Sequence, residues 1–451
     1  MVEKITSVVS FERASFHTPG HKGRPQAFGK SENFRFDIAY DVTELPGLDD
    51  LSQPDGVLRA LENRLASLFR ARRSFISVNG ASACLIAALM AAASLGRRVL
   101  VPVNLHRSAV SGLALSGLEP VWFSPDWNAN YGFYEQVSVA TIEDALNQNE
   151  VGAVLIVSPT YQGAVSDIGA IASLCKKKGV LLIVDEAHGA HLLSSDLMPV
   201  SALQLGADIV VHSLHKTLPG LTQTGALHIA HDSQFSLDHI RSLLTVVQSS
   251  SPSYPLMCSI EHLVDFMSCD KGRARLQMVA ELSVKLRCAV EKLGSFDVFA
   301  QAAIQEPLHV LIRPRFNCEL PLELQKLGIG CEAVFNQAVL FLLGLGSEAR
   351  DVEILIDALR DMASNADDSM LSVRKFEAPP LFKQQMSPAE SLRMPSLVVP
   401  IEDAVDRICV ECVAPCPPGT PVVVPGQLIE KQNLAYMLEF TGIRSLLVAQ
   451  K

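Results

Sequence analysis

Lys216 stands among unusually polar neighbours, in the segment His212-Ser213-Leu214-His215-Lys216-Thr217 that directly follows an apolar run at 207–211. A lysine at the end of a buried strand can have its pKa lowered by burial and by its neighbours. Such a lysine can act as an imine-forming nucleophile. For a lysine considered alone, a solvated position on a surface loop is the commoner alternative.

Asp185 begins a second polar segment, Asp185–His191 (DEAHGAH), at the end of the apolar run at 180–184. An acid here could pair with the protonated ring nitrogen of a cofactor, or hold a metal ion. The string Asp-Glu-Ala-His also occurs in a helicase class that needs an upstream G-x-x-x-x-G-K-[ST] loop. The chain has no such loop, and its formal charge of −10 gives no global attraction for nucleic acid or anionic membrane. We therefore exclude the helicase.

Two more segments could contact a bound anion and an aromatic ring. Val78–Ser82 (VNGAS) joins an apolar run to an Ala-rich stretch, and a strand followed by a small-residue turn and a helix N-terminus forms an anion site. His106 follows the run at 98–103, where its flat ring could stack on a cofactor. Taken singly, Ser82 could equally be an ordinary helix cap and His106 a structural histidine.

Together the four segments supply a phosphate cradle, a stacking ring, an acid and a lysine, in that chain order. Each lies at the carboxyl end of an apolar run. Pyridoxal phosphate needs an imine-forming lysine, a carboxylate at its pyridine nitrogen and an anchor for its phosphate. The combination therefore predicts a pyridoxal-phosphate site, although each signal alone is weak.

Short apolar runs alternate with helical stretches between residues 60 and 230, which predicts βαβ units and a mostly parallel sheet covered on both faces. Ligands of such sheets bind at the carboxyl ends of the strands. Beyond residue 256 the pattern predicts a smaller α+β unit with a strand at His309–Pro314, an apolar segment at Ala333–Leu343 and a helix at Ala349–Met362. We expect an N-terminal arm, a large cofactor domain, a small α+β domain, a linker and a C-terminal α+β unit, at residues 1–59, 60–255, 256–364, 365–394 and 395–451.

Composition limits the class of protein further. The 451 residues are 48% hydrophobic and 19% charged, which is typical of packed globular domains. The longest apolar stretch spans about fifteen residues at 81–95, whereas a membrane span needs roughly twenty. Ten sparse cysteines and no secretory signal predict a soluble protein of the reducing cytoplasm. Cys409, Cys412 and Cys416 lack a nearby fourth ligand for zinc, so no metal is expected.

Several longer strings resemble the fold type I ornithine/lysine/arginine decarboxylases, in particular the short bacterial members. Phe16–Gly23 (FHTPGHKG) and Asp41–Leu51 (DVTELPGLDDL) are similar to the N-terminal signature of that family. The family's later blocks are similar to residues 78–82, 104–108, 158–163, 185–188, 213–217, 250–254 and 417–426. The resemblance implies an aspartate aminotransferase-like fold with a mostly parallel, seven-stranded sheet. It also implies decarboxylation of arginine, lysine or ornithine by a homodimer with shared active sites, or by a larger assembly.

Carried over residue by residue, the resemblance assigns roles to the segments described above. Lys216 would form the imine with the cofactor, Asp185 would pair with the pyridine nitrogen, and His106 would stack on the ring. His188 would line the site and, like Lys216, is a candidate proton donor. The remaining cofactor contacts would come from Gly80, Ala81, Ser82, Ala187, Ser213 and His215. Candidate acids for the distal cation of the substrate are Glu44, Asp49 and Asp50.

Some features leave alternatives open. Cys416 and Gln427 stand where relatives usually have tyrosine and glutamate, which could alter recognition of a cationic side chain. A cysteine desulfurase-like enzyme, with Cys331 as its reactive thiol, or an aminotransferase-like enzyme would also use a lysine-bound cofactor. A catalytically inactive cofactor-binding relative is a third possibility. The sequence does not choose among arginine, lysine and ornithine.

Overall fold

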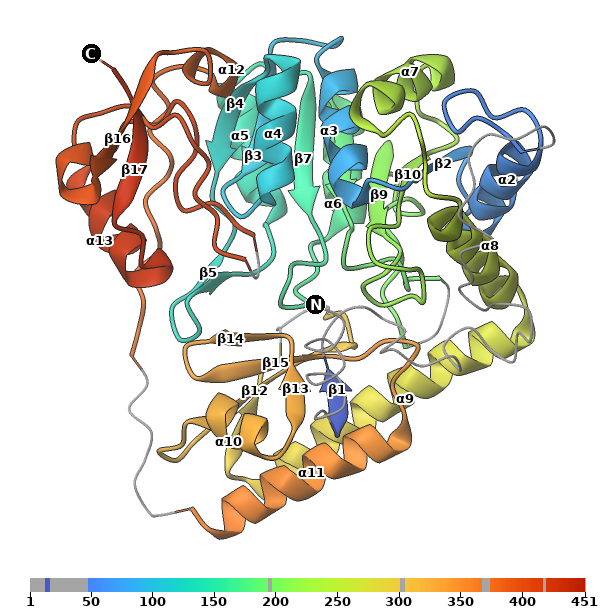
Figure 1. Ribbon diagram of the computed structural model, residues 1–451, viewed down its shortest axis with the longest axis vertical. Helices are drawn as coiled ribbons and strands as arrows, with labels where there is room; N and C mark the ends of the chain where they lie inside the picture. Colours follow the sequence, from blue (N-terminus) through green and yellow to red (C-terminus); the bar gives the residue numbers. More distant parts are fainter. Residues whose placement is uncertain are drawn as a thin grey trace.

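The computed structural model describes residues 13–16, 48–193, 197–300, 305–366, 374–416 and 419–450. Its centre is a seven-stranded sheet, seen edge to edge in Figure 1. β10 runs antiparallel to both of its neighbours, and all other neighbouring strands are parallel. In spatial order the strands are β2 (Arg73–Ser77), β10 (Gly225–Ile229), β9 (Ile209–Ser213), β8 (Leu181–Asp185), β7 (Ala153–Val157), β3 (Arg98–Pro102) and β4 (Glu119–Phe123).

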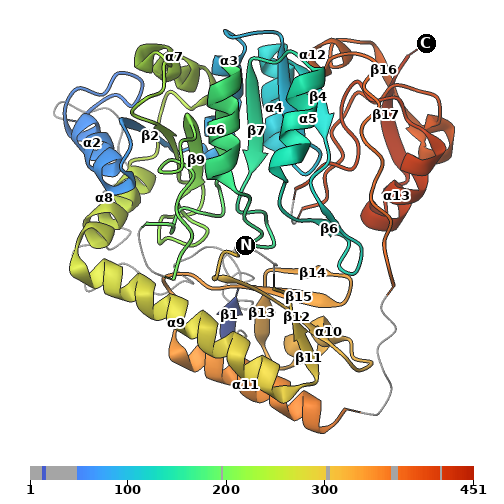
Figure 2. The same ribbon diagram turned by 180° about the vertical axis from the view of Figure 1, so that it is seen from behind.

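Helices cover both faces of this sheet because its strands are apolar on both sides. Successive strand residues point to opposite faces, so Val99 and Val101 join one apolar cluster whereas Leu100 joins the other. The first face carries α3 (Gly80–Ala92), α4 (Arg107–Ser116) and α7 (Leu237–Val247) (Figure 1). The second carries α5 (Val139–Gln148) and α6 (Ile168–Lys178), which come forward in Figure 2. This arrangement confirms the predicted mostly parallel, seven-stranded sheet.

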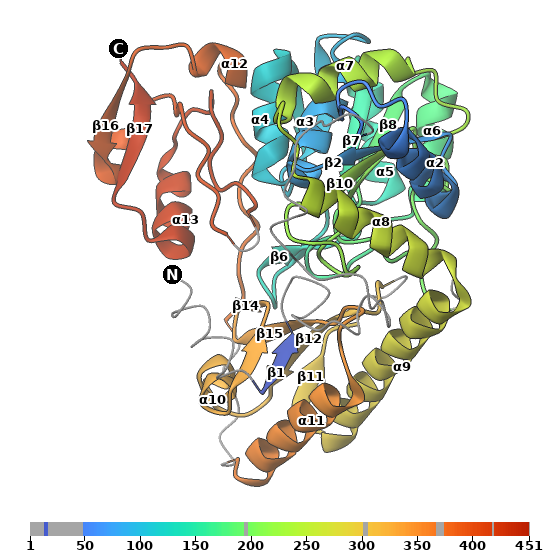
Figure 3. The ribbon, with the colours of Figure 1, turned by 45° about the vertical axis from the view of Figure 1, so that its right-hand side comes forward.

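A second apolar core lies below the large sheet. Here α2 (Val57–Phe69) packs against α8 (Tyr254–Ser268), and α8 leads into the long α9 (Asp270–Leu293). α9 packs with α11 (Ala349–Ser364) against a four-stranded antiparallel sheet. Figure 3 shows β1 (Ala14–Phe16) in blue among the orange strands of this region, where it pairs in parallel with β13 (Ile329–Cys331). The sheet consists of β11 (Phe296–Val298), β12 (His309–Pro314), β15 (Ala338–Leu342) and β14 (Ala333–Phe335), and α10 (Leu320–Lys326) packs beside it.

The last elements form a small unit beside the β4 edge of the large sheet (Figure 1). β16 (Ser396–Pro400) pairs with β17 (Ser445–Ala449), and α13 (Lys431–Thr441) packs against this pair. The helix α12 (Pro388–Ser391) contacts α4, and a short 3-10 helix, η3, spans Ile401–Ala404. A two-stranded hairpin, β5 (Trp127–Asn128) with β6 (Phe133–Tyr134), extends from the large sheet toward the smaller one.

Most of the predicted strands are present, with ends displaced by one or two residues. β12 has the predicted bounds. The apolar segment at 333–343 is two strands rather than one element, because Asn336 and Gln337 both have positive φ and form a tight hairpin turn. Most of the Ala-rich stretch at 81–95 belongs to the thirteen-residue α3, which begins at Gly80, ends at Ala92 and lies buried on the sheet. Among the described residues, no helix is both long enough and apolar enough to span a membrane.

Candidate active site

A cavity of about 740 Å³ lies where the carboxyl ends of the parallel strands meet the smaller sheet. The loops that follow β2, β3, β7, β8 and β9 all contribute to its wall, as expected for the ligand-binding edge of a parallel sheet. Ten of the residues predicted from sequence line this one cavity, namely Gly80, Ala81, Ser82, His106, Asp185, Ala187, His188, Ser213, His215 and Lys216.

The N-terminus of α3 opens into the cavity without a side-chain cap among the described residues. Asn79 occupies the N-cap position, but its side-chain oxygen accepts a hydrogen bond from the Ser249 N–H, 3.2 Å away. The first N–H groups of α3 therefore face the cavity together with the Ser82 side chain. Free N–H groups and the positive end of the helix dipole make this corner an anion site.

Gly225 allows β10 to approach this corner closely. A Cβ atom on Gly225 would lie 2.5 Å from the Ala81 nitrogen and 2.5 Å from the Gly80 carbonyl carbon. Gly80 itself has φ +72°, a left-handed conformation that glycine adopts at little cost. The turn between β2 and α3 is therefore held against β10 by two positions that lack side chains.

Asp185 and Lys216 place opposite charges in the same cavity. Asp185 is the last residue of β8, and its carboxylate accepts a hydrogen bond from the Ala187 N–H at 3.2 Å. Burial raises the pKa of Asp185, and the nearby Lys216 and the Ala187 N–H oppose that rise. Burial lowers the pKa of Lys216, against the attraction of Asp185. The amine is thus shifted toward the neutral form that can act as a nucleophile.

His106 presents a neutral ring to the cavity. Burial, together with Lys216 and Arg107, lowers the pKa of His106 to about 4. Its Nδ1 accepts a hydrogen bond from the Ser108 N–H at 3.2 Å and so caps α4. Gly419 approaches the other side of the ring, since a Cβ atom there would lie 2.9 Å from Cδ2 and Nε2. The ring is therefore fixed from two sides.

His188 lies next to the amine of Lys216. Its Nε2 is 2.7 Å from the Lys216 Nζ, and its ring meets Tyr161 edge to face at 5.0 Å. The Tyr161 hydroxyl donates to Glu332 at 2.7 Å, which connects the cavity wall to the loop between β13 and β14. His215 turns its Nδ1 toward the Thr224 carbonyl at 3.0 Å, and this contact orients its ring.

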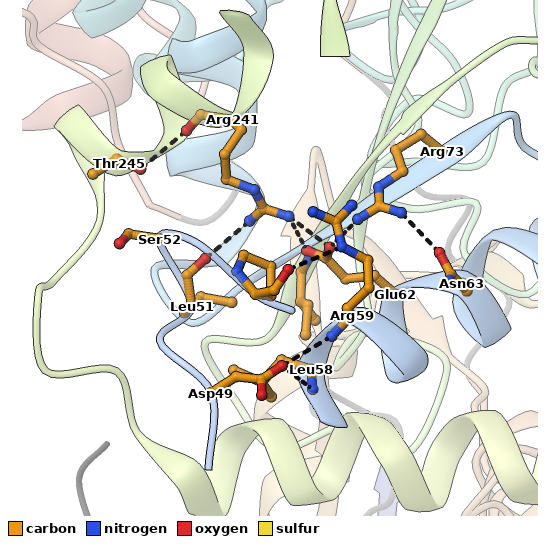
Figure 4. A network of polar contacts seen from close by, with 12 residues as sticks. Asp49, Leu51, Ser52, Leu58, Arg59, Glu62, Asn63, Arg73, Arg241 and Thr245 are labelled. Carbon is orange, nitrogen blue, oxygen red and sulfur yellow. Dashed lines mark hydrogen bonds and ion pairs between the residues drawn. The ribbon is translucent and has the colours of Figure 1, made fainter. Parts of the chain in front are cut away.

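Neither Asp49 nor Asp50, two of the three acids predicted to bind the substrate, lines the cavity. Glu44 lies outside the described residues. Asp49 accepts hydrogen bonds from the N–H groups of Gly56 and Leu58, both at 2.8 Å, and so serves the start of α2 (Figure 4). These bonds lower the pKa of Asp49 although burial opposes them. Asp50 is exposed and borders a separate pocket of about 130 Å³.

Other members of the wall were missed by the sequence reasoning. Four of the six tyrosines and several other aromatic side chains gather here from distant parts of the chain, and the segment expected to be a linker contributes to them. The buried Oδ1 of Asn104, also in the wall, has no hydrogen-bond partner among the described residues. Gln427 is fully buried and does not line the cavity. The aromatic wall comprises Trp127, Tyr131, Phe133, Tyr134, Tyr161, Phe335, Phe376, Phe382 and Tyr436.

Comparison with known families decides the class of protein. The major-domain model of the Orn/Lys/Arg decarboxylases matches residues 1–317, and the model of their C-terminal domain matches residues 371–446. The chain belongs to the Orn/Lys/Arg decarboxylase family. It is therefore a decarboxylase by family, which favours this class over a desulfurase or an aminotransferase.

Individual relatives agree with the family assignment. The chain is 30% identical to an uncharacterized protein, YaaO, of Bacillus subtilis over 96% of this chain and 92% of that one. It is 27% identical to an arginine decarboxylase of Halalkalibacterium halodurans over 94% and 89%. Among solved structures, the constitutive lysine decarboxylase of Escherichia coli has a TM-score of 0.77 at 18% identity, covering 100% of this chain and 81% of that chain. The fold is that of fold type I pyridoxal-phosphate enzymes.

Proposed function

We propose that this protein decarboxylates a basic L-amino acid, namely arginine, lysine or ornithine, with pyridoxal phosphate bound covalently to Lys216. One observation carries the proposal. The amine of Lys216, the carboxylate of Asp185 and the uncapped N-terminus of α3 line the same cavity. Those are the three contacts that pyridoxal phosphate needs, and the names of the relatives supply the class of reaction and of substrate.

The donor set of the cavity fits the cofactor. The N–H groups of Gly80 and Ala81, with the hydroxyls of Ser82 and Ser213, would hold the phosphate, and His215 would lie beside it. When bound, pyridoxal phosphate supplies an electron-withdrawing ring that stabilises the negative charge left on the substrate α-carbon as CO2 departs. The charges of the cofactor and of the cavity also match. The phosphate anion would lie at the N-terminus of α3, and the protonated pyridine nitrogen would face the carboxylate of Asp185.

The residues of the chain would orient these groups and move protons. Asp185 would keep the pyridine nitrogen protonated, and the neutral ring of His106 would stack on the cofactor face, with Ala187 packed on the other side. Lys216 would give up its bond to the cofactor when the substrate amine takes its place, and would displace the product afterwards. Either His188 or Lys216 would supply the proton to the α-carbon. The apolar aromatic wall would exclude water during these steps.

We also propose a cytoplasmic homodimer with shared active sites. The resemblance to the family implies that the segment Ser249–Ser251 would reach the phosphate site of the neighbouring subunit. Here Ser249 donates to Asn79 at the edge of the anion site, so this segment lies beside the cofactor corner. Light scattering of the purified protein would test the assembly, because a monomer in the presence of cofactor would contradict it.

The experiment that tests the function is a CO2-release panel over basic and acidic amino acids. Release from at least one of arginine, lysine and ornithine is expected from the purified protein supplied with pyridoxal phosphate, and none is expected from Lys216→Ala. Borohydride reduction should fix the cofactor at Lys216, as read by peptide mass spectrometry. Turnover of no basic amino acid would refute the substrate class, and fixation at another lysine would refute the site.

A further inference from the structure

A row of buried side chains continues from Lys216 into the smaller domain. His188 contacts Lys216 through Nε2 at 2.7 Å, and its Nδ1 lies 3.0 Å from Nε2 of His309. Nδ1 of His309 forms a short contact with the carboxylate of Glu306. His309 and Glu306 are fully buried, and His188 is nearly so. The row therefore joins the amine in the cavity to a carboxylate that the cavity does not touch.

Glu306 is held as an anion by its surroundings. Its carboxylate accepts hydrogen bonds from the N–H groups of Leu308 at 2.7 Å and His309 at 2.9 Å. His191 contacts it at 2.6 Å and in turn contacts the hydroxyl of Thr217, next to Lys216. Burial alone would raise the pKa of Glu306, but the two histidines lower it well below its ordinary value. An ionised carboxylate has no proton to donate, so it can only accept.

The anion fixes the direction of the whole row. When the ring of His309 holds a single proton, that proton lies on Nδ1 and faces the Glu306 carboxylate, which leaves Nε2 as an acceptor. Nδ1 of His188 then donates to that nitrogen, and the Nε2 lone pair of His188 faces the amine of Lys216. His188 is neutral at rest, because burial, Lys216 and His309 lower its pKa. Its single ring proton therefore has two possible positions, and the row selects one.

We propose that Glu306 and His309 are positioning residues that hold the His188 proton on Nδ1, so that the Nε2 lone pair can accept a proton from the ammonium form of Lys216. In that step an N–H bond of the ammonium breaks, its electron pair stays on Nζ to give the neutral amine, and a new N–H bond forms at Nε2 of His188. The resulting imidazolium keeps its Nδ1–H bond to His309 and is stabilised through it by Glu306. The same logic operates in catalytic triads, where a buried carboxylate sets the tautomer of a histidine base.

The titratable groups that act on His188 are Lys216, His309, His106 and His191. Lys216 is the only amine among them and is therefore the group that can give a proton to Nε2. Beside Glu306, the Arg287 guanidinium on α9 donates to the His309 carbonyl at 2.6 Å and attracts the carboxylate. No other acid contacts His188 among the described residues. The inference concerns residues of the chain alone, although its catalytic meaning rests on the proposed function.

The first experiment reads the tautomer directly. Magic-angle-spinning NMR of cofactor-free protein labelled with 15N-histidine separates protonated from unprotonated ring nitrogens, and His188→Gln assigns the signals. We expect a proton on Nδ1 of His188 in the wild-type chain and a mixture or a proton on Nε2 in His309→Phe. Glu306→Gln should give the same change. The side-chain amide of glutamine can donate a hydrogen bond to Nδ1 of His309, which would reverse the order of donors and acceptors from His309 to His188. A proton on Nε2 in the wild type would overturn the proposal without any variant.

A matched control exists on the other side of the sheet. His228 is also fully buried, and its Nε2 lies 3.1 Å from Nδ1 of His212, in a row that ends at Glu186. Like the row through His309, this row joins two histidine rings to a buried carboxylate, although here His212 rather than His228 contacts the acid, and its hydrogen bonds do not lead to Lys216. His228→Phe should leave the His188 tautomer unchanged. If it alters the tautomer as much as His309→Phe does, the effect is a general loosening of the core and the proposal is wrong.

The second experiment measures the reactivity of the amine without cofactor. Competitive acetylation with acetic anhydride, followed by peptide mass spectrometry, gives the rate at Lys216 relative to exposed lysines. We expect Glu306→Gln to slow this rate about tenfold near pH 8, which is less than the roughly 10²–10⁴-fold of a complete general base because His188 itself is retained. Glu306→Asp should restore part of the rate. An unchanged rate would contradict the inference. Failure of pyridoxal phosphate to bind would instead refute the proposed function and leave these readings intact.

Discussion

Gly225→Ala should weaken cofactor binding by a purely steric route. The new Cβ would lie 2.5 Å from two backbone atoms of the turn that begins α3, whereas ordinary contact begins at 3.4 Å. β10 and the start of α3 must therefore separate by about 0.9 Å, the difference of these distances. Neither side can yield by a rotamer change, since both are backbone. The N–H groups proposed to hold the phosphate would shift by a comparable distance.

Displacements of about 1 Å in binding groups can reduce rates by about a hundredfold. We expect the dissociation constant of pyridoxal phosphate to rise between about tenfold and a hundredfold, which corresponds to about 1.4–2.8 kcal/mol at about 1.4 kcal/mol per tenfold. Absorbance titration of the cofactor-free protein measures this constant. Overpacking should also lower the free energy of unfolding by about 1–3 kcal/mol, measured by urea unfolding.

A second glycine provides the control. In Gly169→Ala, on α6, the new Cβ would have its nearest neighbours at 3.7 Å, so no displacement is needed. This variant should bind the cofactor as the wild type does and should be as stable or slightly more stable. If Gly225→Ala binds pyridoxal phosphate with the wild-type constant, the turn before α3 does not hold the phosphate and the placement of the anion site is wrong.

Three further predictions follow from buried carboxylates. Glu62→Gln should lower the free energy of unfolding by about 3–5 kcal/mol, because Arg73 and Arg241 would lose their shared buried partner at 2.8 and 2.5 Å. Glu119→Gln, in the exposed pair with Arg97, should cost less than about 1 kcal/mol, and equal losses in urea unfolding would contradict the argument. Asp185→Asn should slow CO2 release at least about a hundredfold while the thermal midpoint holds, since burial already raises the pKa of this carboxyl. Burial raises the pKa of Glu186 from 4.5 to about 8. Because the folded protein then binds a proton that the unfolded chain has already lost, the contribution of this proton to the free energy of unfolding is full below pH 4.5 and is lost as the pH rises through 8. Urea unfolding between pH 5 and 8 should therefore show the wild type losing stability relative to Glu186→Gln, and a constant difference would refute this.

The large domain could be predicted because its signals are local. Each parallel strand is a short apolar run, and polar residues that directly follow such runs are brought to one edge of the sheet by the topology. Asp185 and Lys216 are 31 positions apart in the chain, yet the ends of β8 and β9 place both in one cavity. The roles of these residues remain predictions until the cofactor is trapped.

Contacts between distant segments could not be predicted from a single sequence. His188 and His309 are separated by 121 positions, and their contact depends on how the smaller sheet packs below the large one. The hairpin at Asn336–Gln337 was read as one apolar segment because its turn carries no glycine or proline. The hydrogen bonds between Asp49 and the start of α2 could not be predicted either. They form only because the loop from Asp49 to Gly56 folds back and brings the carboxylate to the first turn of the helix.

The cavity is completed by side chains from the C-terminal half of the chain. Every residue proposed to hold pyridoxal phosphate lies between positions 80 and 216, whereas a large share of the aromatic surface facing them comes from 335–436. The enclosure around Lys216 therefore depends on the smaller sheet and the C-terminal unit being folded beside the large sheet. A chain cut short before residue 335 would retain every group proposed to hold pyridoxal phosphate and would still lose this part of the wall.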